Sequence, residues 1–189
     1  YSIDSPLSKG KIEMKYMTAR EEDILTNQNL IENGTVIDKL LQSLIITPID
    51  YNTLLTGDKN AILVAARILG YGKDYSFNHQ GEEKTIDLTE IKDKEIDESL
   101  IEGGKNEFNF TLPTAKIKVT FKILTHGDEK DIEKELKGLK RLNKNISYDI
   151  STRMKYIITS VDGDYETKTI REFVDNYLLA RDSRELRNY

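Results

Sequence analysis

The apolar residues of this chain change their spacing twice, and that change limits the possible folds more than any other feature. In the N-terminal part they recur at helical intervals, from Tyr75 to Ile123 they alternate with polar residues, and after residue 125 the helical spacing returns. We therefore predict an α+β protein, a mainly helical body with a small antiparallel β-subdomain of about four strands. The predicted ranges are an N-terminal strand plus helical region at 1–73, the β-subdomain at 74–124, and a C-terminal helical region at 125–189 that packs on the first.

Capping residues set the first boundaries that we expect. A short strand, in which apolar residues alternate with charged ones, should end near Met17; its apolar residues are Ile12, Met14 and Tyr16. Thr18 and Glu21 have the spacing of a capping box, and acidic residues follow, as suits the positive end of a helix dipole. A helix should therefore begin there and continue to Asn33 and Gly34.

Two further helices are expected before the β-region. One begins at Thr35 and is ended by Pro48; its apolar stripe comprises Val36, Ile37, Leu40, Leu41, Leu44 and Ile45. The other follows Thr56–Asp58. From Ala61 to Leu69 its only polar residue is Arg67, and Gly70 is the expected C-terminal cap. Because this helix is apolar on most sides, we expect it to form the centre of the core.

The alternating region indicates two antiparallel hairpins that share one small sheet. Their turns are expected at Asn78–Gly81 and at Pro113–Thr114, and the apolar side chains that hold them are Phe77, Ile86, Phe108, Phe110 and Phe121. Between them, residues 82–102 carry nine acidic side chains against three lysines, which accounts for the net charge of −5 of the whole chain. Such a charge-rich connection is most simply a solvated, mobile loop.

The C-terminal region again has helical spacing. Thr125 should cap a helix that runs to about Leu142, and a second helix should extend through Val161 to the Asp162–Asp164 turn. A capping box at Thr169 should begin a third helix, whose expected buried residues are Phe173, Val174, Tyr177 and Leu178. The last eight residues have the pattern of another helix cut short, and no initiator Met is present, so we expect the natural chain to be longer.

The sequence offers little catalytic or metal-binding chemistry. The absence of cysteine excludes disulfides, thiolate metal sites and a cysteine nucleophile, and no Gly-x-Ser-x-Gly elbow is present. The histidines, His79 and His126, fall in separate predicted turns, and the acidic residues from Asp162 to Glu166 lack the glycine and glutamate of a calcium loop. No apolar run approaches the ~20 residues of a membrane helix. We therefore expect no metal, no other cofactor and no membrane association.

Basic residues gather in two places that could serve as interfaces. Arg is favoured at protein interfaces, so we select Arg181, Arg184 and Arg187 on the last helix, together with Lys137, Lys140 and Arg141. The simpler alternative is that these side chains form solvated helix faces. Nucleic acid is not the expected partner, because the whole chain is acidic and no aromatic residues are interleaved with the cations.

Seven blocks of the chain carry a resemblance to a known family. They are Ser5–Leu25, Ile37–Leu44, Gly57–Ala61, Arg67–Gly72, Leu124–Glu129, Tyr156–Asp164 and Ile170–Leu186. In this order, over nearly the whole chain, they resemble the baseplate hub and hub-assembly family of T-even-type contractile-tailed bacteriophages. Relatives in that family commonly carry a Cys-x-x-Cys zinc-ribbon-like element in the region of the small sheet. Here Asn78–Gly81 occupies that region, so the resemblance implies no metal for this chain.

The resemblance implies a non-enzymatic structural or assembly protein. We expect a hub component that docks to other tail and baseplate proteins within a symmetric assembly, first in the host cytoplasm and then in the virion tail. The alternative is a hub assembly chaperone that is absent from the mature virion. The resemblance transfers no catalytic residue, and an enzyme or a nucleic-acid-binding protein ranks third.

Overall fold

The computed structural model describes residues 6–92 and 104–189 and confirms the predicted α+β class, with 53% helix. The helices of this part are α1 (Ala19–Leu25), α2 (Gln28–Glu32), α3 (Val36–Leu44), α4 (Thr56–Tyr71), α5 (His126–Leu142), α6 (Asp149–Ile157), α7 (Thr167–Asn176) and α8 (Ala180–Asn188). The strands are β1 (Asp74–His79), β2 (Glu82–Asp87), β3 (Phe108–Thr111), β4 (Lys118–Phe121) and β5 (Ile158–Val161). Short 3₁₀ helices are Pro6–Lys9, Tyr51–Thr53 and Leu88–Glu90.

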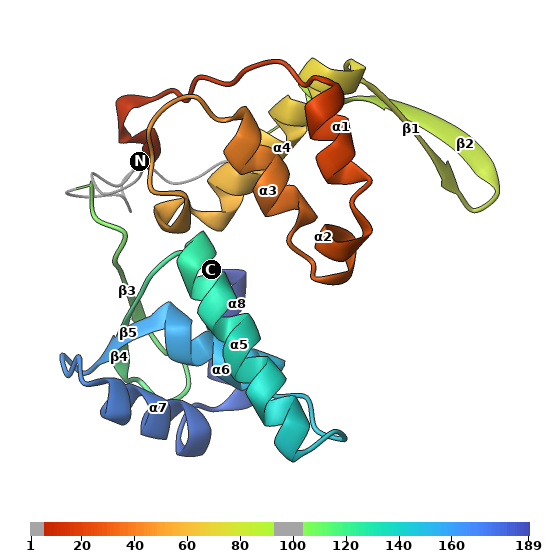
Figure 1. The fold of residues 1–189 in the computed structure, drawn as a ribbon. Coiled ribbons are helices and arrows are strands. Elements are labelled where there is room, and N and C mark those ends of the chain that lie inside the picture. Colours follow the sequence, from red (N-terminus) through yellow and green to blue (C-terminus); the bar gives the residue numbers. More distant parts are fainter. Residues whose placement is uncertain (1–5, 93–103) are drawn as a thin grey trace. The chain divides into compact units, whose positions relative to one another are not determined.

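The described residues belong to two compact units, which we call the N-terminal unit (6–92) and the C-terminal unit (104–189) (Figure 1). The prediction of one shared sheet is wrong, because β1 and β2 form a two-stranded sheet in the first unit, whereas β3, β4 and β5 form a three-stranded sheet in the second. The predicted ranges 1–73, 74–124 and 125–189 stay a prediction. The acidic stretch 82–102 lies partly outside the described residues. Its described part is not a loop as expected, because it contains β2 and the 3₁₀ helix Leu88–Glu90.

Helix α3 supplies the centre of the N-terminal core. Its Leu40, Leu41 and Leu44 are almost completely buried, and they pack with residues of the following segment and of α4, namely Tyr51, Leu54, Ile62 and Ala66. The expectation that α4 would be central is wrong, since Ile62 and Ala66 are the only buried residues of that helix. The apolar stripe of α3 is narrow and continuous, so it can be covered completely by neighbours on one side.

Local hydrogen bonds explain other departures in this unit. The expected first helix is divided into α1 and α2, because the Asn27 side chain accepts a hydrogen bond from the Leu30 amide (3.2 Å) and caps a new helix. The expected strand is reduced to one bridge between Met14 and Ile45. Gly70 lies within α4 rather than at its cap. A Cβ atom at position 70 would come within 3.0 Å of the Met17 side chain.

Glu21 is a buried carboxylate that joins three segments of the N-terminal unit. It accepts hydrogen bonds from the Lys15 ammonium (2.8 Å), the Thr18 amide (3.0 Å) and hydroxyl (2.6 Å), and the Ser43 hydroxyl (2.7 Å). The capping box predicted from Thr18 and Glu21 is confirmed. The hydrogen bonds from Lys15, Thr18 and Ser43 hold the pKa of Glu21 well below its usual range, outweighing the opposite effect of burial.

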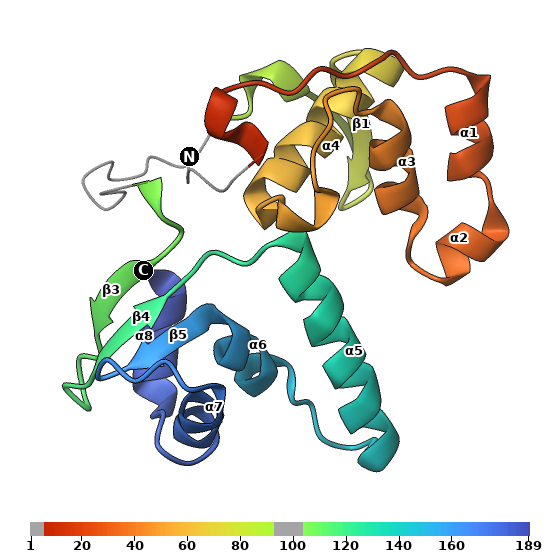
Figure 2. The same ribbon diagram turned by 60° about the vertical axis from the view of Figure 1, so that its left-hand side comes forward.

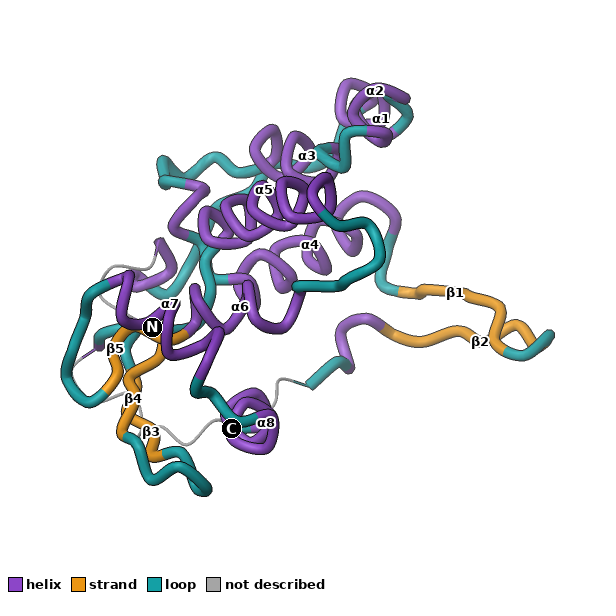
Figure 3. Tube along the Cα trace, turned by 90° about the horizontal axis from the view of Figure 1, so that it is seen from below, coloured by secondary structure: helices purple, strands orange, loops and turns teal. Residues whose placement is uncertain are grey.

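The β1–β2 hairpin projects from the helices of the N-terminal unit as a ribbon (Figure 3). Its two-residue turn has positive φ at Gln80 (54°) and Gly81 (86°), the geometry that matches the twist of paired strands. The predicted turn is confirmed. The expectation that Phe77 and Ile86 hold a buried sheet is wrong, because Ile86 is 41% exposed and Phe77 is half-buried.

The C-terminal unit is built around the β3–β4–β5 sheet, with α6, α7 and α8 covering it (Figure 2). Its buried core combines residues from every one of these layers: Leu112, Val119, Met154, Ile158, Ile170, Phe173, Val174 and Leu186. Helix α5 is held against α6 and α7 by ion pairs. The Arg171 guanidinium donates to both oxygens of Glu135 (2.8 and 2.7 Å) and keeps the pKa of that carboxyl below its usual range.

Two helix predictions in this unit need correction. The helix expected to reach Val161 ends at Ile157, and β5 follows it, pairing with β4 at Val119 and Val161. The helix expected to begin at a Thr169 capping box begins at Thr167 without a side-chain cap. The Thr125 cap of α5 is confirmed, since the Thr125 hydroxyl accepts from the Asp128 amide (3.2 Å).

We predict that Glu21→Gln weakens the N-terminal unit at neutral pH, because a neutral amide cannot accept the same four charge-assisted hydrogen bonds. The folded-state pKa of Glu21 is lowered, so its contribution is present above pH 4.5 and is lost as the pH falls. Urea unfolding followed by circular dichroism at neutral and acidic pH measures both effects. The variant should unfold at lower urea at neutral pH and lose less stability on acidification.

Glu22→Gln is the matched control, since Glu22 lies on the same helix turn but is exposed. Glu22→Gln should change the urea midpoint at neutral pH, and the dependence of that midpoint on pH, much less than Glu21→Gln does. Equal effects of the two variants would show that the hydrogen-bond network around Glu21 contributes nothing specific.

Candidate functional site

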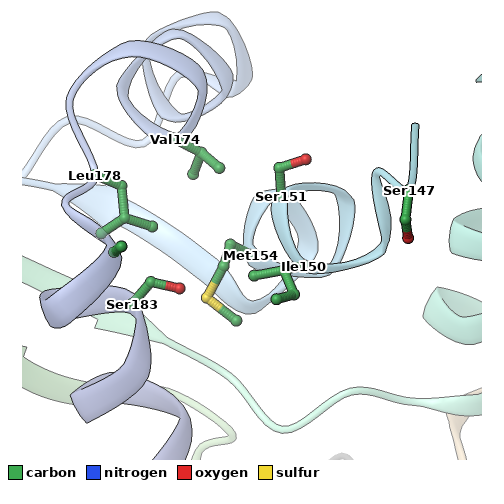
Figure 4. A pocket seen from close by; sticks show the side chains of 8 residues that line it. Ser147, Ile150, Ser151, Met154, Val174, Leu178 and Ser183 are labelled. Carbon is green, nitrogen blue, oxygen red and sulfur yellow. The ribbon is translucent and has the colours of Figure 1, made fainter. Parts of the chain in front are cut away.

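The C-terminal unit contains a pocket where α6, the end of α7 and the beginning of α8 meet (Figure 4). Its volume is about 390 Å³. The wall is mainly apolar, and hydroxyl groups stand at intervals around it; the lining residues are Ser147, Ile150, Ser151, Met154, Val174, Leu178, Ala180 and Ser183. Met154 and Val174 also belong to the buried core, so the floor of the pocket is a fixed part of the fold.

The Ser183 hydroxyl lacks a hydrogen-bond partner among the described residues, although the residue is only 6% exposed. Figure 4 shows its oxygen directed toward Met154 on the opposite wall. Buried hydroxyl groups in folded proteins nearly always have a partner, because an unpaired buried polar group is costly. Thr152 on α6 has a second hydroxyl of this kind, but it does not line the pocket.

Asp182 fixes the position of the first turn of α8. Its carboxylate is completely buried and accepts hydrogen bonds from the amides of Thr114 (2.7 Å) and Ala115 (2.9 Å) in the β3–β4 turn. Burial raises the pKa of this carboxyl, but the two amides outweigh it and the net pKa lies below its usual range. Asp182 therefore remains charged and ties α8 to the sheet.

Exposed apolar side chains line the pocket or neighbour its lining residues in the chain. Ile150, which lines it, is 51% exposed, and the loop between α7 and α8 adds Tyr177 at 60% and Leu179 at 46%. The expectation that Tyr177 is buried is therefore wrong, and Leu178 beside it is only partly buried. Contiguous exposed apolar surface in a water-exposed protein commonly marks an interaction site.

The six basic residues selected from the sequence are all exposed and all belong to the C-terminal unit. Arg181 and Arg184 flank the pocket-lining positions 180 and 183 in the chain. Arg187, one turn further on α8, donates to the Ser183 carbonyl (3.2 Å). Lys137, Lys140 and Arg141 lie on the C-terminal half of α5, and Lys137 forms a long pair with Glu133 (3.5 Å). Of the six basic residues, Arg181 and Arg184 are therefore next to pocket-lining positions in the chain. The role of all six as an interface stays a prediction.

Sequence reasoning missed the pocket itself. Ser183 carries no spacing signal, because a serine within an amphipathic helix is ordinarily a solvated residue. The signal that could have indicated the site is the run Tyr177–Leu179, whose three bulky residues in succession cannot all face one core.

A second exposed surface lies at the base of the β1–β2 hairpin. The Arg67 guanidinium stands 5.1 Å from the ring centre of Tyr71 and 5.7 Å from that of Tyr75, and the Tyr75 ring stacks on Phe77. Tyr71 and Tyr75 are both about half exposed. A ribbon of two strands gains little stability alone, so these ring contacts help to fix its orientation on α4.

The described residues contain no group of three or more His, Cys, Asp or Glu side chains that could hold a metal ion. His79 lies at the exposed end of β1, whereas His126 is buried at the start of α5 in the other unit. Within the same described ranges, no helix is long and apolar enough to cross a membrane. Comparison with protein-family models, with curated proteins and with solved structures finds no match.

We predict that Ser183→Ala does not weaken the fold. Removing a buried hydroxyl that lacks a partner should raise the free energy of unfolding by about 1 kcal/mol. Ser160→Ala is the matched control, because the Ser160 side chain is equally buried but hydrogen-bonded to Thr120 (2.7 Å). That change should lower the free energy of unfolding by about 1 kcal/mol. Denaturant unfolding of both variants measures the contrast, and a similar loss in both would contradict it.

We also predict that the fold does not depend on a metal ion. The chain lacks cysteine, and the described carboxylates and histidines are dispersed. Treatment with EDTA should leave the Tm unchanged in a thermal scan followed by circular dichroism. A clear drop in Tm, accompanied by zinc or calcium in elemental analysis of the untreated protein, would contradict this expectation.

Proposed function

We propose that this chain is a non-enzymatic structural or assembly protein of a phage tail baseplate, and that it acts as a hub component. The observation that carries the proposal is the ordered set of seven sequence blocks, from Ser5–Leu25 to Ile170–Leu186, that resemble the T-even-type hub and hub-assembly family. Several blocks in order over nearly a whole chain are more specific than any single short motif. The proposed partners are other tail and baseplate proteins.

The surfaces of both units support a docking role. The pocket at Ile150 and Ser183 is open to exposed apolar residues, and the hairpin presents exposed rings at Tyr71 and Tyr75. Protein interfaces have apolar and aromatic centres with polar rims, and both surfaces have that composition. Each unit thus offers one surface on which a neighbour could dock.

The proposal also fits the charge of the chain. A net charge of −5 gives no broad phosphate-neutralising surface, and the cations of α5 are partly matched by acids on the same helix, such as Glu133. We therefore propose protein partners rather than nucleic acid or membrane. In this proposal, docking takes place in the host cytoplasm, and copies are then retained in the symmetric baseplate of the virion tail.

Quantitative mass spectrometry of purified mature particles of the encoding phage tests the proposal. We expect the chain in fixed stoichiometry with baseplate proteins. Recovery from infected lysate but not from particles would instead identify the alternative, a hub assembly chaperone. The proposal fails if tail proteins do not co-purify with the chain while it binds DNA with a steep salt dependence that reversing Lys137, Lys140 and Arg141 to Glu abolishes.

A further inference from the structure

The pocket of the C-terminal unit has the features of a site for a protein segment. A site for a small molecule encloses most of its ligand, whereas Ile150 lines this pocket and still exposes half of its surface. Tyr177 and Leu179, on either side of the lining residue Leu178 in the chain, add further exposed apolar side chains. An occupant that fills the pocket and covers these residues must therefore present one inserted side chain and an apolar surface around it.

The unpartnered hydroxyl of Ser183 indicates that the pocket is complete only when occupied. The residue is 94% buried, lines the cavity, and has no hydrogen-bond partner among the described residues. Asp182 holds this turn of α8 against the β3–β4 turn, so the hydroxyl cannot readily rotate with the helix into water. A polar atom on an inserted side chain would satisfy it, which adds a directional requirement to an otherwise apolar pocket.

Charged residues that are close in the chain to the pocket lining favour one sign of charge in the occupant. The segments 144–151 and 178–184, which carry most of the lining, contain the cations Lys144, Arg181 and Arg184 and the acids Asp149 and Asp182. Both acids are already engaged, Asp149 with Arg153 (3.4 Å) and Asp182 with two backbone amides. Lys144 and Arg184 form no ion pair within the described residues, so these two segments carry more unpaired positive than negative charge.

We propose that this pocket receives a mainly apolar side chain with one polar atom, such as tyrosine, from an acidic, amphipathic segment of a partner protein. The inference rests on the proposed docking function and names the chemistry of the partner at one site. The inserted side chain is mainly apolar with one polar atom, as in tyrosine. Its apolar part fills the space between Ile150, Met154 and Leu178, its polar atom pairs with Ser183, and acidic residues that flank it meet Lys144 and Arg184.

Binding of designed peptides to the full chain tests the proposal. One labelled peptide of about 15 residues carries leucine and a single tyrosine on one helical face and glutamate on the other, and its matched control carries lysine in place of glutamate. Fluorescence anisotropy gives the affinities, and amide chemical shifts locate the site. We expect the acidic peptide to bind at least about tenfold more tightly than the basic one and to shift the amides of 147–154 and 174–184.

Variants on the exposed rim keep the test independent of folding. We expect about tenfold weaker binding of the acidic peptide from Ile150→Ser, and the same from the pair Lys144→Glu with Arg184→Glu. Their controls are Ile46→Ser, which removes an equally exposed isoleucine in the N-terminal unit, and the pair Arg20→Glu with Lys39→Glu, which reverses exposed cations there. The controls should leave the affinity unchanged. Circular dichroism confirms that every variant is folded.

Several outcomes would overturn the inference. Equal affinities for the acidic and the basic peptide would refute the proposed charge preference. Amide shifts outside 147–154 and 174–184 would show that the peptide binds at another site. If hexanol shifts the pocket amides while neither peptide binds, the pocket is a small-molecule site. Recovery of the Ile150→Ser variant in particles at the normal stoichiometry would refute the inference and leave the proposed function intact. If the full chain binds the acidic peptide but is found neither in particles nor in baseplate intermediates, the inference holds and the proposed function is refuted.

Discussion

A buried carboxylate must be surrounded by hydrogen-bond donors, and this requirement organises both units of the chain. Glu21 and Asp182 have no exposed surface, and each accepts hydrogen bonds from segments other than its own helix. An unpaired charge at either position would cost more than most side-chain contacts contribute. The arrangement of the donors is therefore fixed: Lys15 and Ser43 must approach Glu21, and the amides of Thr114 and Ala115 must approach Asp182.

The constraint at Asp182 also determines the candidate site. Successive residues on a helix point about 100° apart, so orienting Asp182 toward the β3–β4 turn sets the direction of Ser183. That direction is toward Met154 on α6 (Figure 4). The unpaired Ser183 hydroxyl is thus a consequence of the hydrogen bonds that hold α8, and rotating the helix to solvate it would break them. The pocket is as rigid as the junction between α8 and the sheet.

Sequence reasoning succeeded where a few neighbouring residues decide the structure. The caps at Thr18 and Thr125, the stripe of α3 and the turn at Gln80–Gly81 depend on local chemistry, and the structure has all of them. It failed where tertiary pairing decides. Ile157, Ile158 and Val161 fit the helical spacing. The segment Ile158–Val161, in which every residue but Ser160 is β-branched, is nevertheless a strand because β4 lies beside it.

The candidate site shows the same division. Cations are visible in a sequence, and Arg181 and Arg184 were selected as interface residues for their type alone; the structure adds that they flank the lining of a pocket. Glu21 could be predicted to favour a helix N-terminus, but its burial depends on Lys15 and Ser43, which only the fold brings to it. Ser183 could not be identified, because a missing hydrogen-bond partner is a property of its surroundings and not of its residue type.

The arrangement of apolar and charged groups has a consequence for how docking would work. Exposed ion pairs contribute little net affinity, but rim charges steer encounter and reject partners of the wrong sign. The affinity of the proposed contact must then come from burial of Ile150, Tyr177 and Leu179 and from filling the pocket. In the proposed docking, cations near an apolar pocket would therefore separate two requirements, since the charges would select the neighbour and the pocket would retain it.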